Sequence, residues 1–513
     1  MTFAKQFLGR PFWWALGGFV MLDVASFLAL HTTAELVLLI LLTIALIVVA
    51  VRCPQWLFPL AIAEIIATSN GHSFNVELAG ASIGPRIILF ALLMIVTVIA
   101  IARHGIKPVP RPYRLICALV TAVVFLAVLQ GLILGSTMTN LYLDANGYLA
   151  IGYVLAAWYW VRDGRDRHRL LQLTAAATVW IAAKTLLFLF AFGHLHPKTL
   201  PILYTWIRDT RLGEITFMQA TIWRVFLQSQ WFLVPAALVS TSYMLLAERH
   251  RETGVRVVLL ITAAALIASF SRTFWLATLI AALGLIVIAL WQRVWKSIGR
   301  TATDGAVVTI GSIALLWVIV AVPIYQGASS SIFQSLLRGR ATQTSDAALD
   351  SRRQLLPPLM EAIRRAPISG HGLGKTVAYT TEDPRYQDEH GTDQVTTYAF
   401  EWGWLDYLVK FGIAGTLLFG ICWLLIARDI VLAFRHDPAR RWLYAGLGMS
   451  LIALLIAHTF SPYLNHPIGW GTIAIIVALL PRSTAQQEGV TTQRSVDVPS
   501  MPTSSPLVTG RVK

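Results

Sequence analysis

Long apolar runs recur along almost the whole chain, and they constrain its fold more than any other feature of the sequence. A membrane-crossing helix needs about 20 predominantly apolar residues, and most of these runs are of that order. Of the 513 residues, 56% are hydrophobic and only 13% are charged, which excludes an ordinary soluble globular protein. The sequence therefore predicts an all-α, polytopic integral membrane protein.

The apolar runs, taken in order, predict about fourteen transmembrane helices. We expect them near residues 12–30, 34–51, 54–69, 86–102, 115–135, 147–161, 170–193, 231–247, 257–269, 273–291, 305–323, 398–427, 442–460 and 467–481. This reading divides the chain into a helical block with a medium-sized loop, one large loop, a second helical block and a tail. Their bounds are 1–323 with the medium loop near 194–230, then 324–397, 398–481 and 482–513. The tail is rich in Ser, Thr, Gln and Pro, so we expect it to be disordered.

The basic residues are unequally divided between the two sets of loops. With the N-terminus inside, well over half of the 41 Lys and Arg residues fall in inward loops. The short outward loops contain a single basic residue, Arg272. By the positive-inside rule, both termini are predicted to be cytoplasmic and both long loops to lie on the outer face. This topology also accounts for the net charge of +15, so no nucleic-acid partner is expected.

The large loop separates its charges along the chain, with arginines first and carboxylates after them. Residues 351–366 have the periodicity of a helix whose apolar side contains Leu355, Leu356, Leu359, Met360 and Ile363, and Arg352 falls in the middle of that side. A glycine-spaced turn follows from Pro367 to Gly374, which is either a plain structural turn or a set of N–H groups for an anion. Arginine suits a phosphorylated ligand because its planar fork binds phosphate oxygens in pairs. The alternative is that these charges pair with one another or face water.

Glu401 stands where the span near 398–427 enters the membrane, and no oppositely charged residue follows at helical spacing. Asp406 and Lys410, by contrast, are spaced to neutralise each other within that helix. Arg272 and Arg224 lie at the outer ends of apolar runs, where interfacial snorkelling is the simplest explanation for each. The three cysteines show no paired spacing, so neither a disulfide nor a metal site is expected.

Several of these elements occur in an order typical of one family. A Ser-Phe-Ser-Arg272-Thr segment enters one span, Arg352 begins a helix that ends at the glycine turn, and Gly412-Ile-Ala-Gly415 lies in the following span. In this order the chain resembles the O-antigen ligase and O-antigen polymerase superfamily. The first half agrees with that family only in hydropathy. The resemblance implies a fold similar to GT-C-type glycosyltransferases, with one large periplasmic loop.

The sequence departs from the family pattern at the start of the span near 398–427. Glu401 and Trp402 stand where the ligases have His and Asn, which favours a polymerase or another glycan transferase over a strict lipopolysaccharide ligase. By its position, Glu401 becomes the candidate acceptor base, and the alternative is a carboxylate that only pairs with a loop arginine. Three histidines are further candidates for the base, namely His390, His458 and His466.

The resemblance implies glycosyl transfer at the periplasmic face of a bacterial inner membrane, in O-antigen or exopolysaccharide assembly. The donor would be a polyprenyl-diphosphate-linked saccharide, and the acceptor a hydroxyl of a glycan or lipid–glycan. A diphosphate leaving group needs cations more than a strong acid, so Arg272, Arg352 and Arg224 would bind it without a metal or cofactor. Because one carboxylate stands out rather than two, single displacement with inversion is expected.

Two other classes of function fit a polytopic membrane protein. A flippase for lipid-linked oligosaccharides would have similar spans, but transporters are commonly built from internal repeats, and the sequence shows none. An assembly scaffold for envelope polysaccharide machinery predicts that the outer arginines are dispensable. Transfer by the purified protein alone would exclude both.

Overall fold

A computed structural model describes residues 6–78, 81–106, 109–196, 198–219, 222–247, 252–321, 347–381 and 391–482. Residues 1–480 form one compact unit, and of the second unit, 481–513, only Pro481 and Arg482 are described. The predicted disordered tail therefore lies almost entirely outside the described residues.

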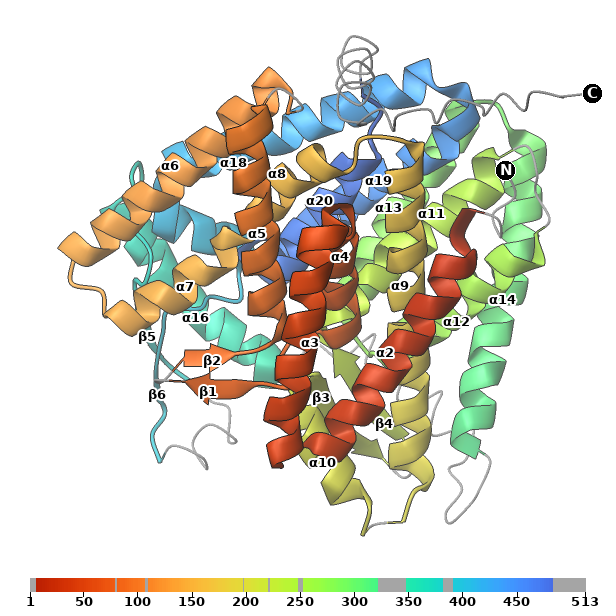
Figure 1. Ribbon diagram of the computed structural model, residues 1–513, viewed down its shortest axis with the longest axis horizontal. Helices are drawn as coiled ribbons and strands as arrows, with labels where there is room; N and C mark the ends of the chain where they lie inside the picture. Colours follow the sequence, from red (N-terminus) through yellow and green to blue (C-terminus); the bar gives the residue numbers. More distant parts are fainter. Residues whose placement is uncertain are drawn as a thin grey trace, which may run out of the picture. The chain divides into compact units, whose positions relative to one another are not determined.

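The described part of the first unit is mostly helical (Figure 1). Its first half contains α2 (Arg10–Ala29), α3 (Thr33–Arg52), η1 (Pro54–Trp56), α4 (Leu57–Thr68), β1 (Val76–Leu78), β2 (Ala81–Ile83), α5 (Pro85–His104), α6 (Arg111–Ile133), α7 (Met138–Leu149), α8 (Gly152–Trp160), α9 (Gly164–His194), α10 (Leu200–Asp209), β3 (Gly213–Gln219), β4 (Ile222–Leu227) and η2 (Gln228–Phe232). Its second half contains α11 (Leu233–Leu246), α12 (Thr253–Ala268), α13 (Arg272–Trp291), α14 (Trp295–Ala321), α16 (Ala347–Arg365), β5 (Val377–Thr380), β6 (Gln394–Thr397), α18 (Gly403–His436), η3 (Pro438–Arg440), α19 (Arg441–Phe460), η4 (Tyr463–Asn465) and α20 (Pro467–Leu479).

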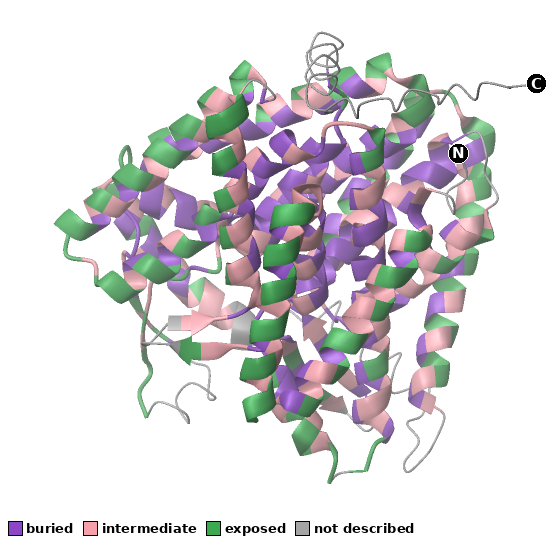
Figure 2. Cartoon of the chain, viewed as in Figure 1, coloured by how far each residue is buried: buried purple, intermediate pink, exposed green. Residues whose placement is uncertain are grey.

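Burial separates central helices from peripheral ones. In the most apolar stretch of α9 and of α19, 56% and 61% of the residues are buried, against 17% in α3, α5 and α6. The peripheral helices expose large apolar side chains along much of their length, as the green residues of α3 and α6 in Figure 2 show. An apolar surface of this kind is stable against lipid and not against water.

Nine of the described helices are long and apolar enough to cross a membrane. The other five predicted spans correspond to shorter helices, namely α4, α8, α11, α12 and α20, which have 9 to 16 residues. The chain is therefore a polytopic membrane protein by length and composition, but the predicted count of fourteen spans is not confirmed.

The helical prediction missed three antiparallel two-stranded sheets in the described residues: β1–β2, β3–β4 and β5–β6. The β3–β4 pair lies in the predicted medium loop and aligns Thr216 with Arg224. The β5–β6 pair lies in the large loop and aligns Val377 with Thr397. These strands are short and partly polar, so a search for long apolar runs does not detect them.

The described part of the large loop is folded against α18. The helix α16 runs through Pro357 and Pro358 to Arg365, and its Leu355 and Leu359 are buried as the periodicity predicts. They pack with Val377 of β5 and with Phe400 and Val409 at the start of α18. Met360, which was predicted on the same side, is 42% exposed, and Ala362 is buried in its place.

The glycine turn inserts into a break in α18. Gly412 has a φ of +63° inside that helix, a conformation that favours glycine. The turn fills the break, because His371 N–H donates to the Val409 carbonyl at 2.7 Å and Gly372 N–H to the Lys410 carbonyl at 3.0 Å. These N–H groups bind protein carbonyls, which supports the structural reading of the turn over the anion-binding one.

Candidate active site

Arg352 and Glu401 form a hydrogen-bonded ion pair through the Nε of Arg352. Arg352 lies in α16, and Glu401 lies two residues before α18. Trp402 also joins these two segments, since its indole N–H donates to the Arg352 carbonyl at 2.9 Å. The Arg352 side chain is 27% exposed and that of Glu401 is 52% exposed. Glu401 therefore takes its charged partner from the large loop, as the pairing alternative proposed, and remains open to solvent.

Arg224 contacts the turn that precedes Arg272, although 48 positions separate the two arginines in the sequence. The turn between α12 and α13 is Ser269, Phe270 and Ser271, and Arg272 is the first residue of α13. Arg224, on β4, donates from Nε to the Ser269 carbonyl at 3.3 Å, and its guanidinium lies 4.8 Å from the centre of the Phe226 ring. Both arginines are partly buried, so neither extends freely into solvent.

Aromatic side chains pack around the start of α13. Phe274, two positions after Arg272, stacks on Phe226 with ring centres 5.8 Å apart and lies 6.0 Å from the ring of Tyr463. Burial raises the pKa of the Tyr463 phenol well above its ordinary value, while the nearby positive charge of Arg352 acts in the opposite direction. Phe274 therefore joins the β3–β4 hairpin to Tyr463, in the turn between α19 and α20.

A polar cavity of about 360 Å³ lies beside Arg224. Its wall includes Thr216, which pairs with Arg224 across the hairpin, and also Asn70, Tyr204, Arg208, Arg211, Glu214, Phe226 and Gln228. The Oδ1 atom of Asn70 is buried and has no hydrogen-bond partner among the described residues. The cavity thus combines cations, amides and aromatic rings. Arg208 and Arg211 lie in the predicted medium loop and Asn70 follows α4, and the sequence did not single out any of the three.

The cavity has a positive electrostatic environment. Burial, with the positive charges of Arg211 and Arg86 acting in the same direction, lowers the pKa of His72 to about 4. His72 is therefore neutral at ordinary pH and adds no charge of its own. The fixed charge near the cavity comes from its arginines, opposed by Glu214, whose carboxylate lies 4.0 Å from Arg224.

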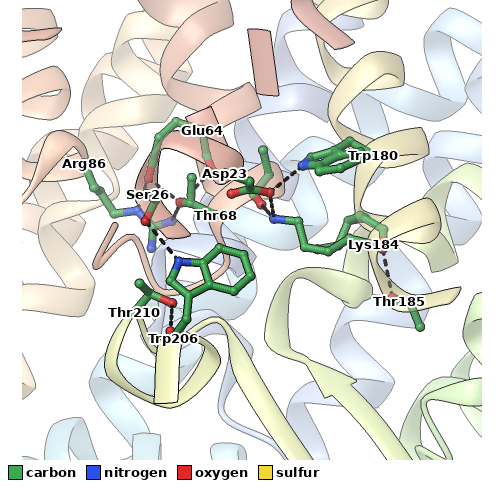
Figure 3. A network of polar contacts seen from close by, with 12 residues as sticks. Asp23, Ser26, Glu64, Thr68, Arg86, Trp180, Lys184, Thr185, Trp206 and Thr210 are labelled. Carbon is green, nitrogen blue, oxygen red and sulfur yellow. Dashed lines mark hydrogen bonds and ion pairs between the residues drawn. The ribbon is translucent and has the colours of Figure 1, made fainter. Parts of the chain in front are cut away.

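Two ion pairs lie at the C-terminal end of α4, close to Asn70 of the cavity wall (Figure 3). Arg86 pairs with Glu64 at 2.9 Å and donates to the Ser69 carbonyl at 2.7 Å. Lys184 pairs with Asp23 and donates to the Ala67 carbonyl at 2.9 Å. Both cations thus bind carbonyls at the C-terminal end of α4, where the helix dipole favours positive charge. Asn70 of the cavity wall follows directly.

A second buried ion network lies in α18, shortly after Glu401 in the sequence. Lys410 Nζ lies 2.6 Å from carboxylate oxygens of Asp406 and of Asp144 on α7. This confirms the predicted Asp406–Lys410 pair and adds Asp144, which the sequence analysis did not select. The other oxygen of Asp144 accepts the Gly374 N–H at 2.8 Å. The network therefore ties α7, the glycine turn and α18 together.

The alternative histidines occupy different environments. His390 lies outside the described residues. His458 is fully buried in α19, where its ring packs 4.8 Å from Trp404 and 5.0 Å from Tyr407. His466 caps α20 by accepting the Ile468 N–H at 3.3 Å, and burial lowers its pKa to about 3. Of the four candidate bases, three are described, and among those three Glu401 has the most exposed side chain.

Comparison with known proteins finds one family similarity, in the second half of the chain. A search of curated proteins finds no match. Residues 257–420 match the family model described as O-Antigen ligase. The matched region runs from α12 into α18 and contains Arg272, Arg352, the glycine turn, Glu401 and Gly412, whereas Arg224 and the polar cavity precede it. Over this region, about a third of its length, the chain is similar to the O-antigen ligase family.

Proposed function

We propose that the protein transfers a saccharide from a polyprenyl-diphosphate-linked donor to an acceptor hydroxyl at the periplasmic face of the inner membrane. The observation that carries this proposal is the Arg352–Glu401 ion pair, which joins the large loop to the residues just before α18 and leaves the Glu401 carboxylate open to solvent. The family match supports membrane glycan transfer in O-antigen assembly.

Each charged group has a task in such a reaction. The acceptor oxygen forms a bond to the anomeric carbon while the bond to the diphosphate oxygen breaks. The departing diphosphate gains negative charge, which Arg272 and Arg352 stabilise, with Arg224 assisting. The Glu401 carboxylate accepts the proton of the acceptor hydroxyl. Since one base acts and no covalent glycosyl intermediate forms, the anomeric configuration inverts.

The Arg352–Glu401 pair suits this scheme because it uses only Nε of the guanidinium. The two terminal nitrogens remain available for phosphate oxygens, and the carboxylate is oriented beside the leaving group. The polar cavity beside Arg224 gives the sugar a place to bind, since its amides and aromatic rings match hydroxyls and the apolar faces of sugars. A metal ion has no step in this mechanism.

The proposal is tested with purified protein in nanodiscs, native lipid-linked glycan and candidate acceptors, by measuring release of the lipid diphosphate. Arg352→Ala and Arg272→Ala should abolish release, and Arg352→Lys should restore little of it because the fork is lost. Arg353→Ala is the matched control, since Arg353 is the next residue on α16 and its side chain is 59% exposed.

Release by the purified wild-type protein would exclude a flippase and a scaffold, because neither breaks the sugar–phosphate bond. Near-normal release by the Arg352→Ala and Arg272→Ala variants at saturating donor would overturn the diphosphate assignment. Movement of the donor across a vesicle membrane without any release would favour the flippase.

A further inference from the structure

A second cationic cavity lies at the other end of α9 from the β3–β4 hairpin. It has a volume of about 390 Å³, and its wall includes Arg165 and Arg167 in the first turn of α9 and Arg440 of η3. The hairpin contacts the opposite end of this helix, where the Phe192 ring lies 5.2 Å from Trp223. From Arg167 to Phe192, α9 rises about 38 Å. The cavity is therefore remote from the candidate active site.

Two carboxylates near this cavity, Asp163 and Asp437, already have partners. Asp163 caps α9 by accepting the N–H groups of Arg165 and Asp166, each at 2.9 Å. Asp437 accepts the hydroxyl of Tyr444 at 3.2 Å and lies 4.0 Å from Arg440.

Arg167 leaves a donor unused at this cavity. Its Nε is buried and has no hydrogen-bond partner among the described residues. A buried donor without an acceptor is costly, so an acceptor supplied by a ligand would stabilise it.

An apolar cavity adjoins the cationic one. Its volume is about 120 Å³, and it shares Leu171, Leu443 and Leu479 with the cationic cavity. Its wall is almost wholly apolar, and the hydroxyl of Thr178 donates to the Thr174 carbonyl of its own helix rather than into the space. An apolar cavity of this order accepts a hydrocarbon group in other proteins.

We propose that the two cavities together bind one anionic phospholipid on the face predicted to be cytoplasmic. The headgroup phosphate lies against Arg165, Arg167 and Arg440, and part of one acyl chain enters the apolar cavity. Arginine forks bind phosphate oxygens in pairs, and basic pockets between membrane helices favour anionic headgroups. A free phosphate would leave the apolar cavity empty, and a zwitterionic lipid would bring a cation next to three arginines. This inference does not depend on the proposed function.

The test compares ligands on the purified full-length protein after its lipids have been removed. Native mass spectrometry measures how much dioleoyl phosphatidylglycerol, dioleoyl phosphatidylcholine or inorganic phosphate the protein retains. The phosphatidylglycerol should bind more tightly than the other two, and added salt should weaken it. This comparison needs no substitution, so it stands even if a variant fails to fold. Equal retention of both lipids, or equally tight binding of phosphate, would overturn the proposal.

Two variants then locate the site. The double variant Arg167→Gln, Arg440→Gln should weaken phosphatidylglycerol binding about 30-fold, from the usual contribution of two basic residues near an anionic headgroup. Arg435→Gln is the matched control, because Arg435 is an exposed residue of the last turn of α18 and lines neither cavity. Ala236→Leu, which reduces the apolar cavity, should weaken the lipid but leave phosphate binding unchanged. Unchanged lipid binding in both variants would place the lipid elsewhere and contradict the proposal.

Discussion

At the scale of single residues, the Arg352–Glu401 ion pair is compatible with two roles for Glu401. A carboxylate that only stabilises the fold and one that also accepts a proton both pair with an arginine. They differ in what remains when the carboxylate becomes an amide. An amide oxygen still accepts a hydrogen bond from Arg352 but is a far weaker base.

Glu401→Gln should therefore reduce turnover by about 10²–10⁴-fold while donor binding persists. Steady-state release of lipid diphosphate and direct donor binding are measured on the same preparation. Glu361→Gln is the matched control, since Glu361 has the same 52% side-chain exposure as Glu401 and also pairs with an arginine. Weaker donor binding with unchanged turnover at saturation would reduce Glu401 to a pairing role. A fully active variant would point to one of the histidines.

His466 gives a pH prediction at the same scale. Its folded pKa of about 3 lies below the usual value near 6.5, so between these pH values the unfolded chain binds more protons than the folded one. Stability should thus fall as the pH drops from about 6.5 toward 3. His466→Asn keeps an acceptor for the Ile468 N–H but does not titrate, so it should flatten part of that fall in a melting series. The exposed His436→Asn should not, and equal slopes for both variants would contradict the assignment.

At the scale of helices and turns, the break in α18 shows what local sequence does and does not determine. The periodicity of residues 351–366 predicts a helix with Leu355 and Leu359 inside, and the structure has it. The spacing of Asp406 and Lys410 likewise predicts their pairing. Neither pattern indicates that Asp144 joins them, because that contact spans 266 positions and depends on how α7 packs. Asn70, Arg208 and Arg211 were missed for the same reason.

Gly412→Ala should destabilise the protein strongly. A methyl group there would collide with the Ile368 carbonyl and approach the Gly370 nitrogen within 2.6 Å, and the positive φ alone costs roughly 1–2 kcal/mol. Gly420→Ala in the same helix is the control, because nothing lies within 4 Å of its added methyl group. Melting of the detergent-solubilised variants should separate them by many degrees. Equal melting temperatures would mean that the turn does not depend on this break.

At the scale of the whole molecule, the proposed reaction requires the large loop to lie on the periplasmic face of the membrane. The charge distribution predicts that Thr380 lies outside and Thr303 inside. A membrane-impermeant thiol reagent applied from the periplasm should label Thr380→Cys and not Thr303→Cys, both of which are exposed positions. The wild-type chain, with its free Cys53, Cys117 and Cys422, provides the background. The reverse pattern would invert the topology and remove the basis for a periplasmic reaction.

The buried network of Asp144, Asp406 and Lys410 also bears on how the protein is made. A ribosome adds about 5–20 residues per second, so Lys410 emerges some 13–53 seconds after Asp144. During that interval Asp144 lacks the lysine that neutralises it in the folded protein, and an unpaired carboxylate is costly to bury. By contrast, Glu64 and Arg86 are only 22 positions apart and can enter the membrane as a neutral pair. We therefore expect α7 to remain at the membrane surface, or beside the insertion machinery, until α18 has been synthesised.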